Sequence, residues 1–175
     1  MTELLRRDWA APAVVLVIGL ATILTAWGFQ IVGGYIPCAL CLQQRVPYYV
    51  GLPIALVALV ISVTGTRPMV VRILLIAVAL AFAVGAFIGV YQAGAEWGFW
   101  PGPASCGAAS GGGDPGTSLL EQIKHIRVVS CTEAHWRFLG LSFAGWNAVV
   151  SAGLFLIALF GAFRQAEPAR KHAHA

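Results

Sequence analysis

The sequence predicts an all-α membrane protein, a bundle of four transmembrane helices with a short interfacial helix in the second outer loop. Two features favour this fold. Hydrophobic residues make up 59% of the 175 residues and charged residues only 10%, whereas soluble domains carry about 25% charged residues. The charged residues also leave four long gaps, and each gap can hold the roughly 20 apolar residues that cross a bilayer.

The gaps define the predicted helices in order. We place the four transmembrane helices near residues 12–32, 42–63, 69–92 and 142–163. The outer loops then cover about 33–41 and 93–141, and residues 1–175 form a single integral membrane domain. The first apolar run follows Arg6 and Arg7 and extends for about 20 residues, longer than the core of a signal peptide. We therefore expect a retained membrane anchor.

The basic residues predict the orientation of the bundle. Four helices put both termini and the short middle loop on one side of the membrane. Seven of the eleven basic residues lie on that side, namely Arg6, Arg7, Arg67, Arg72, Arg164, Arg170 and Lys171. By the positive-inside rule this side is the cytoplasm. The net charge of +4 thus reflects orientation, and we expect no nucleic acid partner.

The second outer loop has two parts. Residues 101–117 are rich in Gly, Pro and Ser, which predicts a flexible segment. Residues 117–129 predict a short amphipathic helix. Its apolar face consists of Leu119, Leu120, Ile123 and Ile126. This helix either lies on the lipid surface or packs on the rest of the protein.

Four cysteines lie on or beside the outer loops, where a disulfide framework or one metal site could form. Cys38 and Cys41 form a C-x-x-C motif where the second helix begins, and a helix N-terminus stabilises a thiolate. Arg45 lies one turn after Cys41 on the same predicted face. A charge at this depth indicates a functional role, and the alternative is that Arg45 extends to the outer headgroups. Cys106 and Cys131 enclose 24 residues of the second outer loop, either as a structural disulfide or as an exchanging pair.

Three segments resemble the DsbB family of bacterial inner-membrane disulfide-bond formation proteins. The first is Pro37-Cys38-Ala39-Leu40-Cys41 with Arg45, the second is Pro101-Gly102-Pro103-Ala104-Ser105-Cys106, and the third runs from Ser130-Cys131 through Trp136-Arg137-Phe138-Leu139-Gly140-Leu141 to Trp146. With the four spans, the resemblance covers nearly the whole chain. It implies a thiol:quinone oxidoreductase in the inner membrane, with ubiquinone or menaquinone as the cofactor.

The resemblance also implies roles for the four cysteines. A reduced, thioredoxin-like periplasmic partner of the DsbA type would attack Cys106. Cys131, its resting partner, would then join Cys38 in an inter-loop disulfide. Cys41 would remain as a thiolate facing the quinone, supported by Arg45.

The third helix departs from the family pattern in one place. Some relatives carry a histidine near its outer end, where this chain has Gln92 and Ala93. Gln92 can donate a hydrogen bond to a quinone carbonyl, but it cannot supply a charge or a proton near pH 7. We predict Gln92 as a further quinone contact.

Two other functions fit the same cysteine count. The four cysteines could converge on a zinc ion, although structural zinc sites normally use two short C-x₂₋₄-C motifs. Cys106 and Cys131 do not form such a motif, so we predict no metal site. The chain could also be a purely structural four-helix protein with disulfide-bonded loops. Quinone reduction separates both alternatives from the oxidoreductase.

Overall fold

The computed structural model describes residues 9–65, 67–102, 127–128, 134 and 137–165. It contains four helical segments that are long and apolar enough to cross a membrane, which confirms the predicted all-α fold. Most of the predicted interfacial helix lies outside the described residues. Arg127 and Val128, near its expected end, are part of a strand instead, because their backbone pairs with the first outer loop.

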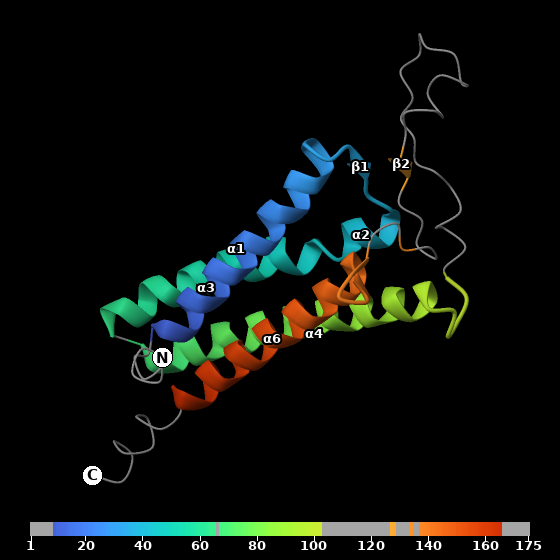
Figure 1. The fold of residues 1–175 in the computed structure, drawn as a ribbon. Helices are drawn as coiled ribbons and strands as arrows, with labels where there is room; N and C mark the ends of the chain where they lie inside the picture. The colour runs from blue at the N-terminus through green and yellow to red at the C-terminus, as the bar shows by residue number, and fades with distance from the viewer. Residues whose placement is uncertain (1–8, 66, 103–126, 129–133, 135–136, 166–175) are drawn as a thin grey trace.

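The helices pack as a bundle, and the elements of the outer loops gather at one end of it (Figure 1). Their bounds are α1 (Ala10–Ile31), α2 (Ala39–Gln43), α3 (Val46–Thr64), α4 (Pro68–Glu96) and α6 (Phe143–Arg164). The second apolar segment is therefore two helices, α2 and α3, joined at Gln44 and Arg45. The third reaches Glu96, beyond the predicted end at residue 92, so an acidic side chain occupies its last turn.

The turn between α3 and α4 lies at the opposite end of the bundle (Figure 1). Gly65 ends α3 with φ of 66°, a left-handed conformation that glycine adopts without steric cost. Pro68 then begins α4, where its missing N–H removes no helical hydrogen bond. The start of α1 and the end of α6 lie at this same end.

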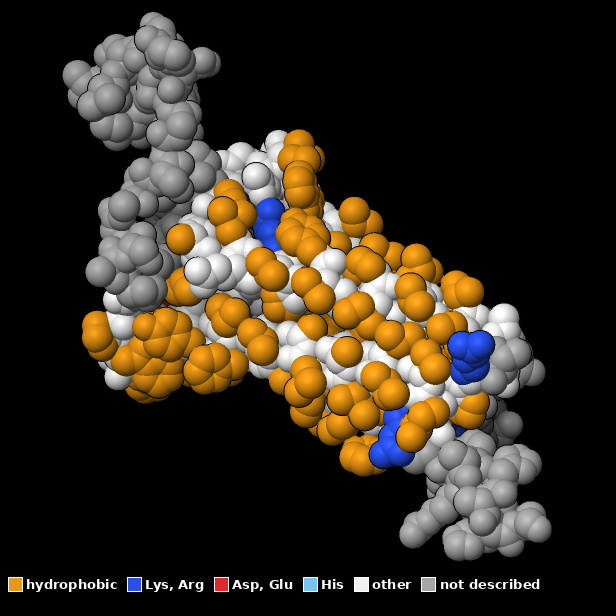
Figure 2. Space-filling view, turned by 180° about the vertical axis from the view of Figure 1, so that it is seen from behind, with side chains coloured by type: hydrophobic (Ala, Val, Ile, Leu, Met, Phe, Trp, Pro, Cys, Tyr) orange, Lys and Arg blue, Asp and Glu red, His pale blue; other side chains and the backbone are white. Residues whose placement is uncertain are grey.

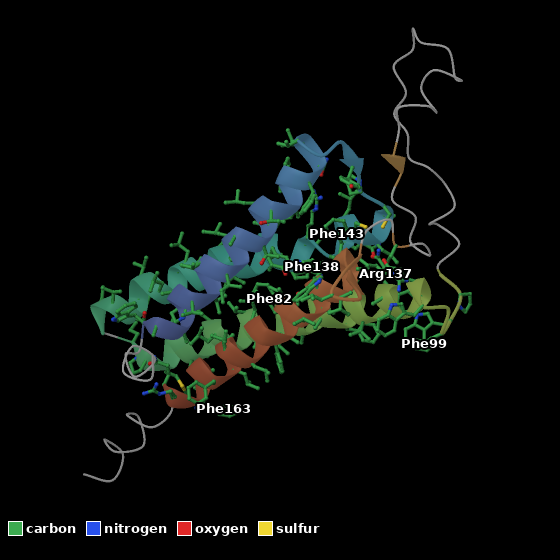
Figure 3. All side chains as sticks on the ribbon, viewed as in Figure 1. Phe82, Phe99, Arg137, Phe138, Phe143 and Phe163 are labelled. Carbon is green, nitrogen blue, oxygen red and sulfur yellow. The ribbon has the colours of Figure 1, made fainter. Side chains whose placement is uncertain are left out.

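Small residues bring α4 and α6 close together. A Cβ on Gly89 would lie 2.9 Å from both Cβ and the backbone nitrogen of Ala148. Such contacts between small residues are typical of membrane helices, whose association depends on close packing. In the middle of the bundle, Phe82 is fully buried and lies between the helices (Figure 3). Its ring meets the Tyr48 ring edge to face, with 5.2 Å between the ring centres.

The flank of the bundle is apolar. Figure 2 shows hydrophobic side chains spread along its length. Val17, Leu80 and Phe87 are 62–72% exposed, and soluble monomers rarely expose continuous apolar surface of this extent. The flank is therefore suited to the hydrocarbon interior of a membrane. Helix α1, which forms part of it, carries no charged residue.

Two short strand pairs organise the other end. β1 (Tyr35–Ile36) pairs in parallel with β2 (Arg127–Val128), which joins the two outer loops. β3 (Arg137–Phe138) pairs antiparallel with β4 (Leu141–Ser142). The loop between β3 and β4 has two residues with positive φ, Leu139 and Gly140, as a type I′ hairpin requires. Ser142 then caps α6 by accepting a hydrogen bond from the Gly145 N–H at 3.2 Å.

Candidate active site

The first cysteine pair lies where α2 begins. Cys38 is the N-cap residue, and its sulfur accepts a hydrogen bond from the Cys41 N–H at 3.2 Å. Both are free thiols, with Cys38 buried and Cys41 partly exposed. The pKa of Cys38 is raised, first by its hydrogen bond with the Cys41 side chain and then by burial. A proton shared by the pair therefore stays on Cys38, and Cys41 is the sulfur available to carry negative charge.

Gln92 connects this pair to the rest of the bundle. Its side-chain nitrogen lies 3.6 Å from the Cys41 sulfur and 3.8 Å from the Cys38 sulfur. The same nitrogen lies 3.3 Å from Oε1 of Glu96, one turn along α4. Gln92 is only 2% exposed. The structure thus places Gln92 beside both sulfurs, a position that its sequence neighbourhood did not specify.

A chain of hydrogen bonds continues from Gln92 across three helices. The Gln92 side-chain oxygen accepts from Gln44 at 2.7 Å, and the Gln44 oxygen accepts from Asn147 at 2.7 Å. Tyr48 donates to Asn147 at 2.8 Å and lies 3.3 Å from the Ser151 hydroxyl. Buried amides and hydroxyls need such partners, so this chain fixes the orientation of the Gln92 amide.

Arg45 lies on the other side of the site. It is the N-cap residue of α3, and its guanidinium faces α1. It donates to Gln30 Oε1 at 2.6 Å and to the Ala26 carbonyl at 3.4 Å, and its guanidinium carbon lies 5.9 Å from the centre of the Trp27 ring. Arg45 lies one turn after Cys41, as the spacing predicts, although a turn at Gln44 and Arg45 with right-handed helical backbone separates α2 from α3.

A cavity of about 390 Å³ brings these groups together. Cys41, Arg45 and Gln92 all line it, whereas Cys38 does not. The apolar walls of the cavity come mainly from α1 and α6. One wall residue, Phe143, lies at the end of the bundle that carries α2 (Figure 3). An apolar cavity with a few polar groups is typical of a site for a small organic molecule. A quinone fits these properties, since it has an apolar ring and two carbonyl acceptors for the Arg45 and Gln92 donors.

The second pair, Cys106 and Cys131, lies outside the described residues. The described strands nevertheless bring neighbours of the two pairs together. β1 ends two residues before Cys38, and β2 ends three residues before Cys131. In the parallel pairing of β1 with β2, Ile36 lies opposite Val128.

Comparisons with known proteins agree with these features. The family model described as disulfide bond formation protein DsbB matches residues 8–161. The chain belongs to the DsbB family. A relative named disulfide bond formation protein B, from Polaromonas sp., is 33% identical over 132 residues, which cover 74% of this chain and 76% of the relative. No solved structure matches the chain significantly. The protein is thus a multi-pass membrane protein of disulfide bond formation, in a family that is generally linked to quinones.

Sequence reasoning missed several residues of this site. Gln44, Asn147, Tyr48 and Ser151 belong to the hydrogen-bond chain, and Glu96 lines the cavity. Polar side chains within apolar segments are a recognisable signal, because burying them in a membrane is costly unless they are paired. That signal could have identified Gln44 and Asn147, but not which partners they would meet.

Proposed function

We propose that this DsbB-family protein is a thiol:quinone oxidoreductase that reoxidises a periplasmic DsbA-like dithiol partner and passes two electrons to a membrane quinone. The observation that carries the proposal is the shared cavity. It holds the Cys41 sulfur of a C-x-x-C pair together with the donors of Arg45 and Gln92, between apolar walls that suit a quinone ring.

The cysteines would act in series. The partner thiolate attacks Cys106 of the Cys106–Cys131 disulfide and forms a mixed disulfide, which releases Cys131. In the oxidised form of the site, Cys38 and Cys41 would be joined as a disulfide. The Cys131 thiolate then attacks Cys38, the Cys38–Cys41 bond breaks as the Cys131–Cys38 bond forms, and Cys41 is left as the thiolate in the cavity. The parallel pairing of β1 with β2 supports this order, because it places Ile36, two residues before Cys38, opposite Val128, three residues before Cys131.

The energetics favour an external electron acceptor. DsbA is known to have a potential near −120 mV, whereas structural disulfides lie below about −300 mV. This gap of about 180 mV corresponds to roughly 8 kcal/mol for two electrons, so an ordinary disulfide could not oxidise such a partner. A quinone accepts two electrons and two protons when it is bound. Arg45 and Gln92 would hold its carbonyls, and Cys41 would face its ring.

The proposal is tested by mixing the purified protein anaerobically with a reduced DsbA-type protein and ubiquinone-1 or a menaquinone analogue. Quinone absorbance should fall by one equivalent for each partner disulfide formed. Thiols and bound zinc are counted in the same preparation. An absence of quinone reduction would contradict the proposed function, and stoichiometric zinc on four thiols would support the metal-binding alternative.

Membrane orientation gives one prediction. We expect both termini and the loop at Arg67 in the cytoplasm, and all four cysteines on the periplasmic side, because of the bias in basic residues. A thiol-reactive, membrane-impermeant label should modify a cysteine placed at Thr66 only after the cells are opened. Labelling of that position in intact spheroplasts, with equal expression, would reverse the orientation.

The loop pair gives another prediction. In Cys131→Ser, Cys106 is a free thiol without a resting partner. It should attack the disulfide of the oxidised DsbA-type partner, release one partner thiolate, and remain joined to the other partner sulfur as a mixed disulfide that a reductant releases. A diagonal gel and mass spectrometry identify the adduct. Cys106→Ser is the matched control and should give none. If Cys131→Ser also gives no adduct, the loop pair is structural and does not exchange with the partner.

A further inference from the structure

Glu96 occupies an unusual position in the site. It is the only acidic side chain among the described residues, it ends α4, and it lines the cavity together with Cys41. Its Oε2 atom is buried and has no hydrogen-bond partner in the described part of the chain. A buried carboxylate oxygen without a partner is costly. A proton or a bound group at Oε2 would remove that cost.

The one described hydrogen-bond donor to Glu96 also faces two other acceptors. The Gln92 side-chain nitrogen faces Glu96 Oε1 at 3.3 Å as well as the two sulfurs. An amide nitrogen has two hydrogens, so it cannot serve three acceptors at once. When a thiolate at Cys41 takes one of them, Glu96 loses part of its support as an anion. A proton on Glu96 resolves the competition.

Electrostatic repulsion between Cys41 and Glu96 also favours transfer of a proton to Glu96. Negative charges on Cys41 and on Glu96 would repel each other across the site. The other titratable groups that line the cavity are Tyr35 on β1, Arg45 before α3 and Tyr48 on α3, and α1 and α6 contribute none. Arg45 directs its described hydrogen bonds to α1, so no cation among the described residues is paired with Glu96.

We propose that Glu96 is the proton carrier of this site, which moves a proton between the Cys41 thiol and a bound quinone oxygen. This inference rests on the proposed function. Where Cys41 is protonated, Glu96 Oε2 gains the proton as the S–H bond breaks to give the thiolate of the proposed exchange, and Glu96 then releases this proton to the quinone oxygen. Two thiols become one disulfide, two electrons pass to the quinone, and the two thiol protons end on the two quinol oxygens. Glu96 transfers one of them.

Turnover provides the first test. Glu96→Gln keeps the shape of the side chain and an acceptor for Gln92, but it cannot carry a proton. We expect its maximal rate of quinone reduction to fall about 100-fold, within the range for lost acid–base groups, with little change in the KM for quinone. Glu96→Asp should recover part of the rate. Glu121→Gln, which removes a carboxylate from the outer loop, is the control.

Alkylation provides a test without quinone. In protein whose other cysteines are serine, the rate of Cys41 alkylation by iodoacetamide is followed against pH. Glu96→Gln removes the opposing charge, so the midpoint of the alkylation curve should move down by roughly one pH unit. A purely structural Glu96 would leave the midpoint unchanged.

The outcomes separate the two proposals. If the wild-type protein reduces quinone and Glu96→Gln shows unchanged turnover and an unchanged alkylation midpoint, only the role of Glu96 is overturned. If the wild-type protein reduces no quinone, the proposed function fails and the proton carrier fails with it. If Glu96→Gln does not fold, Glu96→Asp provides the test. A loss of turnover in Glu96→Asp that does not change with pH would reject the role of Glu96 as proton carrier.

Discussion

Replacing Cys41 with Ser should abolish quinone reduction while the loop cysteines still react with the partner. Cys41 is the only cysteine among the described residues that lines the cavity. A serine hydroxyl keeps nearly the same shape and can accept from Gln92, but it cannot give up electrons or form a disulfide. Quinone absorbance, measured with excess reduced partner, should therefore stay at its background rate.

The control for this prediction is a single-turnover reaction. Cys41→Ser should still oxidise about one equivalent of the partner, because Cys106, Cys131 and Cys38 are all present. Cys38→Ser should also lose steady turnover, but its Cys41 should remain open to alkylation from the cavity. Normal turnover of Cys41→Ser would place electron transfer at another sulfur and would reject the site proposed here.

Much of the fold follows from local sequence. Long gaps between charged residues identify membrane helices because a charge in hydrocarbon is costly, and the structure has four helical segments in those gaps. The position of Cys38 and Cys41 at the start of a helix also follows from local sequence, since the loop of Gly33, Gly34 and Pro37 ends there. These features depend on composition along the chain rather than on contacts across it.

The environment of Arg45 could not be predicted in the same way. Spacing alone put it one turn after Cys41 but could not show that the guanidinium donates to Gln30 on α1. A single-helix pattern cannot show this, because the direction of Arg45 depends on how α1 packs beside α3. The pairing of Gln44 with both Gln92 and Asn147 likewise joins residues from three helices and has no local signal.

Gln92 and Glu96 together explain how the site could work without a histidine on α4. Gln92 lies beside both sulfurs as a neutral donor and cannot carry a proton near pH 7. Glu96, one turn away, has the titratable group that Gln92 lacks. In this interpretation two residues on one face of α4 divide hydrogen bonding and proton transfer between them.

Arg45→Ala should weaken the apparent affinity for quinone about 10- to 100-fold, with a much smaller effect on exchange between the partner and Cys106. The reason is the loss of a charged hydrogen bond at the cavity, which costs roughly 1.5–3 kcal/mol, where about 1.4 kcal/mol corresponds to a factor of ten. The measurement is steady-state turnover against quinone concentration with the reduced partner saturating. Arg45→Lys should recover only part of the affinity, because an ammonium keeps the charge but lacks the planar guanidinium.

A second variant separates binding from support of the fold. Arg45 holds α3 to α1 through Gln30 at 2.6 Å, so Arg45→Ala could act through a shifted helix. Gln30→Ala removes that contact and keeps the guanidinium at the cavity. If Arg45 binds quinone directly, Gln30→Ala should change the apparent affinity several-fold less than Arg45→Ala, in protein of equal thermal stability. Equal losses in the two variants would make Arg45 a positioning residue of α3, and an unchanged quinone dependence in folded Arg45→Ala would remove it from the quinone site.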